Sequence, residues 1–124
     1  MPPAQFQAVH PVLPSRNVPA LIEFYVARLG FSLAFQDAEN DPRYAGVRRD
    51  NVELHLQWHD PAEWQAVERP MLRFLVADVA ALFDEYRDQQ VFHDRTALRD
   101  TAWGTREFAF FDLDQNGLTF YCDL

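Results

Sequence analysis

The sequence predicts an α+β fold built from two tandem modules, each with a strand, a helix and three further strands. Three observations support it: an internal repeat, helical spacing of apolar residues in both copies, and strand-like runs around each helix. Shifting the chain by 61 positions aligns residues 15–31 with 76–92. Two such halves, packed side by side, would form a curved mixed sheet with the helices on its outer face.

The first module begins with a strand-like run at residues 6–13, followed by a helix that starts after Asn17. Asn17 is a suitable N-cap, because its side chain can accept the free backbone N–H groups of the first turn. Apolar residues with a helical period follow, and Gly30 supplies the C-terminal stop. Three strand-like runs come next, at residues 31–36, 44–49 and 51–58.

The second module repeats this order. A strand-like run covers residues 71–76, and Asp78 is the N-cap of a second amphipathic helix. Residues 93–103 are polar and predict a short edge strand. Two strand-like runs close the chain, at residues 106–113 and 117–121.

The link between the modules, residues 59–70, has a proline near each end and forms a natural seam. Each half is too small to bury its apolar face well alone. We therefore expect a single domain over residues 1–124, with module one at about 1–60 and module two at about 70–124.

The composition is that of an ordinary globular domain rich in aromatic residues, which make up 15% of the chain. The formal charge is −8 and all 11 basic residues are arginine. Such an acidic surface disfavours nucleic acid and anionic membranes, and the lack of lysine excludes a Schiff-base nucleophile. Cys122 is the only cysteine, which excludes an intramolecular disulfide. No segment resembles a signal peptide or a membrane span, so we expect a cytoplasmic protein.

Three stretches resemble the vicinal oxygen chelate superfamily of glyoxalases, bleomycin-resistance proteins and extradiol dioxygenases. They are VLPSRNVPALIEFYVARLGF, YAGVRRDNVELHL and WGTREFAFFDLDQNG, in this order along the chain. The similarity is greatest to bleomycin-resistance proteins. It implies the glyoxalase/bleomycin-resistance fold and a small homodimer that binds drug in grooves at the subunit interface. Such proteins exchange an N-terminal strand, and the prolines of MPPAQFQAVHPVL suit an edge strand or arm, although the sequence leaves the exchange open.

The resemblance also indicates four positions from which metal-dependent members take ligands: His10, Glu53, Met71 and Thr119. Glu53 and Thr119 are expected to be equivalent, because each follows an apolar residue after a polar turn. His10 and Glu53 are competent ligands for zinc, iron or manganese, whereas Met71 and Thr119 are not typical. His55 lies two residues after Glu53 on the same strand face and can add a third ligand. We favour no metal and no cofactor, with a divalent metal as the alternative.

Expected ligand-binding residues follow from the same resemblance. Drug-binding relatives hold flat aromatic groups between aromatic side chains, and Trp103 and Tyr44 match two such walls. Gln57 falls at a small polar position of the groove, and Asp41 in the loop before Tyr44 can meet a cationic tail. The alternatives are that Trp103 packs over the sheet edge and that the Asp41 loop is a solvated turn.

Three charged or polar residues complete the expected site. Glu53 and His55 lie on the polar face of their strand, which suits a wet groove or open solvent. Arg73 shares the face of Met71, and a buried guanidinium needs an acidic partner such as Glu53 or an anionic ligand. No nucleophile–base pair and no phosphate-binding glycine loop is evident.

The sequence therefore favours a metal-free, dimeric binding protein for a small aromatic, cationic molecule such as an antibiotic. Two alternatives stay open. One is a divalent-metal lyase or dioxygenase of the glyoxalase or extradiol type, and the other is a binding module for an anionic metabolite.

Overall fold

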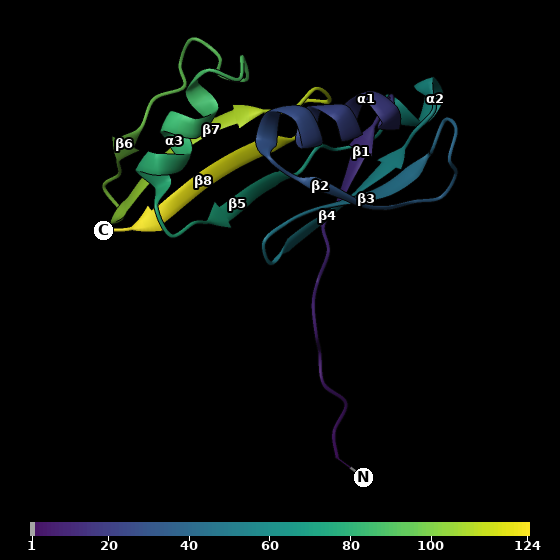
Figure 1. Cartoon of the computed structure of the whole chain (residues 1–124), viewed down its shortest axis with the longest axis horizontal. Helices are drawn as coiled ribbons and strands as arrows, with labels where there is room; N and C mark the ends of the chain where they lie inside the picture. Colours follow the sequence, from purple (N-terminus) through teal and green to yellow (C-terminus); the bar gives the residue numbers. More distant parts are fainter. Residues whose placement is uncertain (1) are drawn as a thin grey trace.

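The computed structural model describes residues 2–124 and confirms the predicted α+β class (Figure 1). The strands form two four-stranded mixed sheets with the orders β1-β4-β3-β2 and β5-β8-β7-β6. In each sheet the first strand of the module runs parallel to its neighbour, and the other pairs are antiparallel. The longer helices lie on one side of both sheets, so each sheet has a helix-covered face and an open face (Figure 1).

The first sheet and its helices use the elements expected for module one. They are β1 (Val12–Ser15), α1 (Val18–Glu23), the π-helical turn η1 (Phe24–Arg28), β2 (Ser32–Gln36), β3 (Tyr44–Arg49) and β4 (Val52–Trp58). Asn17 caps α1 as predicted, its side chain accepting the backbone N–H of Ala20 at 3.2 Å. Gly30 follows with φ +78°, a conformation that favours glycine.

The strand expected at residues 6–13 is wrong in its start, because β1 begins only at Val12. Residues 2–11 carry no helix or strand and extend away from the body of the molecule (Figure 1). The physical reason is that, within residues 2–124, no strand lies beside this segment to pair with it. We call residues 2–11 the N-terminal arm.

The second half contains a short helix in the link and then the second sheet. The elements are α2 (Pro61–Trp64), β5 (Met71–Leu75), α3 (Val79–Arg87), β6 (Arg99–Asp100), β7 (Thr105–Phe111) and β8 (Gly117–Asp123). Asp78 caps α3 through the backbone N–H of Ala81 at 3.0 Å, and β6 is the predicted short edge strand. Within residues 2–124, no helix has the length and apolarity needed to cross a membrane.

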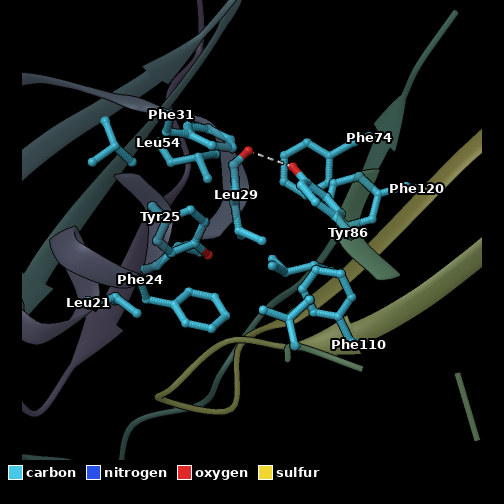
Figure 2. Close-up of a cluster of buried hydrophobic side chains, with 14 of the residues drawn as sticks. Leu21, Phe24, Tyr25, Leu29, Phe31, Leu54, Phe74, Tyr86, Phe110 and Phe120 are labelled. Atoms are coloured by element: carbon cyan, nitrogen blue, oxygen red, sulfur yellow. Dashed lines mark hydrogen bonds between the residues drawn. The ribbon is translucent and has the colours of Figure 1, made fainter. Parts of the chain in front are cut away.

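A single aromatic-rich core lies between the helices and both sheets (Figure 2). Tyr25 from the first half and Tyr86, Phe110 and Phe120 from the second are at most 3% exposed. The Tyr86 hydroxyl donates to the carbonyl of Leu29 at 2.7 Å, which links α3 to the end of the first helix. The continuous core fixes how the two sheets sit relative to each other.

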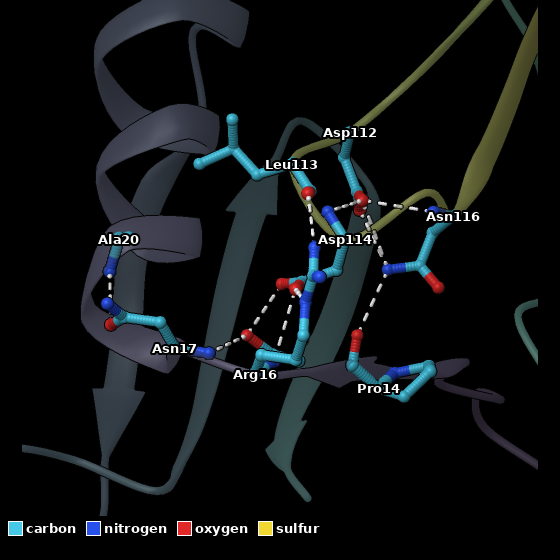
Figure 3. Close-up of polar contacts among 9 residues, drawn as sticks. Pro14, Arg16, Asn17, Ala20, Asp112, Leu113, Asp114 and Asn116 are labelled. Atoms are coloured by element: carbon cyan, nitrogen blue, oxygen red, sulfur yellow. Dashed lines mark hydrogen bonds and ion pairs between the residues drawn. The ribbon is translucent and has the colours of Figure 1, made fainter. Parts of the chain in front are cut away.

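A cluster of buried polar side chains around the β7–β8 turn also holds the two sheets in place relative to each other (Figure 3). Tyr25 donates to Asp112 at 2.8 Å, and Ser15 donates to Asp114 at 2.7 Å. Asn116 donates to the carbonyl of Pro14 and to Asp112. Burial raises the pKa of Asp112, although hydrogen bonds from Asn116 and Tyr25 oppose the rise. These contacts join the two halves and hold the open faces in place.

Candidate functional site

The open face of the first sheet gathers most of the polar residues singled out in the sequence. Strand alternation puts Glu53, His55 and Gln57 on this face of β4, while the residues between them face the core. Tyr44 lies opposite Gln57 on β3. Phe35 joins the same face from β2, opposite Gly46. We call these residues (Phe35, Tyr44, Glu53, His55 and Gln57) the first open face.

A chain of hydrogen bonds runs across the first open face. The Tyr44 hydroxyl lies 2.8 Å from Nδ1 of His55, and Nε2 of His55 lies 2.9 Å from Oε2 of Glu53. In the tautomer whose Nε2–H donates to the carboxylate, Nδ1 accepts the hydroxyl proton of Tyr44. Arg48 donates to Oε1 of Glu53 at 3.0 Å. The bonds from His55 and then from Arg48 hold the pKa of Glu53 below its usual value, so this carboxylate is ionised at neutral pH.

Aromatic rings surround this chain. The Phe35 and Tyr44 rings are nearly parallel with centroids 6.2 Å apart, and Phe35 meets His55 edge-on at 5.1 Å. His10, at the base of the N-terminal arm, stacks on His55 at 4.8 Å. Phe35 remains 41% exposed, so a ring surface is open to a ligand. Flat groups bind well against such rings.

Phe35 is a site residue that sequence reasoning missed. The β2–β3 register shifts between Leu33 and Phe35, which breaks the alternation that would have assigned Phe35 to this face. Its ring lies over Gly46, where an added Cβ would come within 2.3 Å of the ring. Gly46 is therefore needed for the Phe35 ring to rest on β3. A glycine inside this strand was the sequence feature that could have indicated a ring packed over it.

On the open face of the second sheet, Arg73 faces the carboxylate of Glu107 and not Glu53, so the suggested pairing with Glu53 is wrong. Nη2 of Arg73 donates to Oε2 of Glu107 at 3.1 Å, and the Thr105 hydroxyl donates to the same oxygen at 2.8 Å. Glu107 is only 6% exposed. Burial alone would raise its pKa, but the bonds from Thr105 and Arg73 outweigh burial and lower it. The guanidinium also lies over the Tyr121 ring at 4.4 Å, so Arg73 does not need an anionic ligand.

Two predicted site residues lie apart from the first open face. Trp103 is 66% exposed in the turn before β7, in the half of the molecule opposite to β3 (Figure 1). Asp41 lines a different hollow with Arg16, Arg43 and Trp58. The fold therefore brings Tyr44, Glu53, His55 and Gln57 together and leaves Trp103 and Asp41, like Arg73, elsewhere.

Residues 7–120 match the family model described as the glyoxalase/bleomycin resistance protein/dioxygenase superfamily. The chain belongs to this superfamily. A bleomycin resistance protein of Geobacillus stearothermophilus is 25% identical over 126 residues, covering 90% of this chain and 92% of the relative. A crystal structure of the bleomycin-binding protein from Streptomyces verticillus with copper(II)-bleomycin is 30% identical, with a TM-score of 0.75 over 94% of this chain and 96% of that one. The bleomycin resistance determinant of transposon Tn5 has a TM-score of 0.79 at 22% identity, covering 95% and 98%.

The four metal-ligand positions implied by the superfamily can be compared with the strand registers. Val12 lies opposite His55, and Arg73 lies opposite Thr119. Because the repeat relates Val12 to Arg73, Thr119 corresponds to His55, and its expected equivalence to Glu53 is wrong. The β7–β8 turn has five residues between its paired ends and the β3–β4 turn has two, so position after the turn does not identify equivalent residues.

The superfamily's four-position metal set does not fit this chain. Met71 is 73% exposed, and its thioether is a soft ligand. Thr119 offers only a neutral hydroxyl, and it lies opposite the cationic Arg73 on the neighbouring strand. A smaller group does exist in the first half: ligand atoms of His10, Glu53 and His55 lie within 4.8 Å of one another. There, Glu53 already accepts hydrogen bonds from Arg48 and His55.

Proposed function

We propose that the protein is a bleomycin-resistance-type binding protein, which sequesters a small aromatic, cationic molecule in the cytoplasm without cofactor or chemistry. The observation that carries the proposal is the first open face, where the exposed ring of Phe35 and the half-buried ring of Tyr44 adjoin the ionised carboxylate of Glu53. The 30% identical bleomycin-binding protein supports the choice of ligand class.

The proposed mechanism needs affinity alone. A planar heterocycle lies against the rings of Phe35 and Tyr44, whose geometry is held by the Tyr44–His55–Glu53 chain. A cationic group of the ligand approaches Glu53, whose other neighbour Arg48 is exposed and can turn away. Sequestration requires stoichiometric protein and no turnover, so a nucleophile or general base is unnecessary.

We further propose that the groove is completed by a second copy of the chain. In the proposed groove Trp103 is the second wall, yet it precedes β7 of the second sheet, whereas Tyr44 lies on β3 of the first. The subunit exposes 8233 Å², against about 6,900 Å² for a compact monomer of its mass. Phe6 and Val9 of the N-terminal arm are 102% and 89% exposed, and the outer edges of β1 and β5 are unpaired. A homodimer with exchanged arms would cover these surfaces.

Subunit complementation tests the shared groove. Homodimers of Trp103→Ala and of Tyr44→Ala should each bind bleomycin weakly in isothermal titration calorimetry. After the two variants are unfolded and refolded together, about a quarter of the grooves should regain both walls, because each heterodimer carries one intact groove. Mass spectrometry verifies that heterodimers have formed. If the refolded mixture still shows no tight bleomycin sites, the groove is not shared between subunits.

A divalent-metal enzyme of the glyoxalase or extradiol type is the second candidate, favoured by the proximity of His10, Glu53 and His55. Two imidazoles and one carboxylate can hold zinc, iron or manganese, and a bound metal would supply Lewis-acid chemistry. Elemental analysis of protein purified without chelator distinguishes the candidates. One equivalent of metal that is lost in His10→Ala supports the enzyme, and a trace amount unchanged in that variant supports metal-free binding.

A further inference from the structure

A hollow lies where the two halves of the molecule meet, and no residue of the first open face lines it. Its volume is about 490 Å³, within the range of small-molecule sites. The β3–β4 hairpin forms one wall, and β5, the β5–α3 turn and α3 form the other. We call it the seam hollow.

The floor of the seam hollow is aromatic and rigid. Phe31, Phe74, Tyr86 and Phe120 line it, and each is at most 9% exposed (Figure 2). Phe74 and Phe120 stack at 4.9 Å with a 15° angle between their planes, and Tyr86 meets Phe120 edge-on at 5.6 Å. The small side chain of Ala81 on α3 leaves the space above them free. A preformed aromatic floor suits a flat apolar group.

The rim of the seam hollow carries an excess of negative charge. Its charged residues are Arg49, Asp50, Asp78 and Glu85. Arg49 is fully engaged with Glu85, to whose two oxygens it donates at 2.8 and 3.0 Å. Asp50 and Asp78 have no cationic partner among the described residues, although Asp78 also accepts the N–H of Ala81. Asp50 has φ +52°, a strained conformation that is often found beside binding sites.

We propose that the seam hollow is a second ligand site, which takes a small aromatic cation. The ring lies on Phe74 and Phe120, and an amidinium or ammonium group faces Asp50 at the rim. An anion would meet the uncompensated carboxylates, and a purely apolar molecule would leave them without a partner. Because both halves line the site, a bound molecule bridges them.

Benzamidine is a suitable probe, with benzoate as the matched anion. We expect benzamidine to shift the backbone amide signals of Ala77 and Ala81 in two-dimensional NMR, saturating at millimolar concentration as befits a small fragment. Benzoate should leave these signals unchanged. Ala81→Leu fills the hollow from an exposed helix position and should abolish the shifts, and Asp50→Asn should weaken binding about two- to fivefold.

A Tyr44→Ala variant separates this proposal from the proposed function. The variant alters the first open face, so it should leave the Ala77 and Ala81 shifts intact while it weakens bleomycin binding. Shifts that vanish in Tyr44→Ala, or that persist in Ala81→Leu, would overturn the seam site. Equal binding of benzoate would also overturn the seam site. So would signals at Ala77 and Ala81 that move with protein concentration alone, because a second copy of the chain would then occupy the hollow.

Discussion

Replacing Arg73 with methionine removes the cation beside the buried carboxylate of Glu107. The long side chain of methionine keeps much of the packing over Tyr121, so the main change is electrostatic. Glu107 is 6% exposed and would keep only the hydroxyl of Thr105 at 2.8 Å as a hydrogen-bond donor to Oε2. The variant therefore isolates the contribution of the Arg73–Glu107 ion pair, on the open face of the second sheet, to the free energy of unfolding.

The size of the loss follows from the burial of the two partners. Leaving a fully buried charge unpaired costs about 3–5 kcal/mol. The Arg73 side chain is 47% exposed, so solvent screens the pair and we expect a loss of about 1–3 kcal/mol at pH 7. For a chain of this length, each kcal/mol lowers Tm by roughly 3–5 °C.

The loss should depend on pH with a definite sign. In the wild type the pKa of Glu107 is lowered, so its stabilising contribution is present above the unfolded pKa and is lost as pH falls through the folded value. Without Arg73, the Thr105 hydroxyl and the charge of Arg99 alone oppose the effect of burial, so the pKa of Glu107 rises and its carboxylate stabilises the fold less. The difference between wild type and Arg73→Met is therefore largest near pH 7 and shrinks towards about pH 4.

Urea unfolding followed by circular dichroism measures this difference. Arg95→Met is the matched control, because Arg95 is exposed and has no ion pair within residues 2–124. Adding Glu107→Gln to Arg73→Met should recover most of the stability, since no buried charge then remains. Equal stability of Arg73→Met and Arg95→Met at pH 7 would refute the assignment of Glu107 as the partner of Arg73.

Three further predictions concern the core, the site and the arm. Tyr25→Phe removes the donor to Asp112 at 2.8 Å and should lower the free energy of unfolding by about 1–2 kcal/mol in the same urea assay. Gly46→Ala should push the Phe35 ring off β3, with a loss of about 1 kcal/mol and a severalfold weaker bleomycin titration; unchanged affinity would remove Phe35 from the site. Deleting residues 2–9 should convert the proposed dimer to a monomer in sedimentation velocity, whereas a dimer that survives the deletion would show that the arm is dispensable for assembly.

The fold was predictable because its signals are local. The caps Asn17 and Asp78, the helical spacing and the strand runs each depend on a few neighbouring residues, and the repeat doubled every signal. The arm was misassigned because strand-like composition does not form a strand without a partner to pair with. The pairing of β1 and β5 with the last strand of their sheets needed strand order, which local signals do not contain.

The site was predictable only in part, for the same reason. Alternation along β4 correctly grouped Glu53, His55 and Gln57, because period-two spacing is local. The partner of Arg73 depended on the neighbouring strands β7 and β8, and a bulge in β2 concealed Phe35. The counterpart of Thr119 depended on strand register, because the two hairpins have turns of different length.

The proposed function is binding without chemistry at the first open face. Isothermal titration calorimetry with bleomycin, followed by mass spectrometry of the recovered drug, tests it most directly. We predict saturable binding of about one molecule per subunit, as expected for a symmetric dimer with two grooves, and recovery of the drug with unchanged mass. Absence of binding heat at high micromolar drug would contradict binding at this face, and recovery of a chemically altered drug would contradict the absence of chemistry.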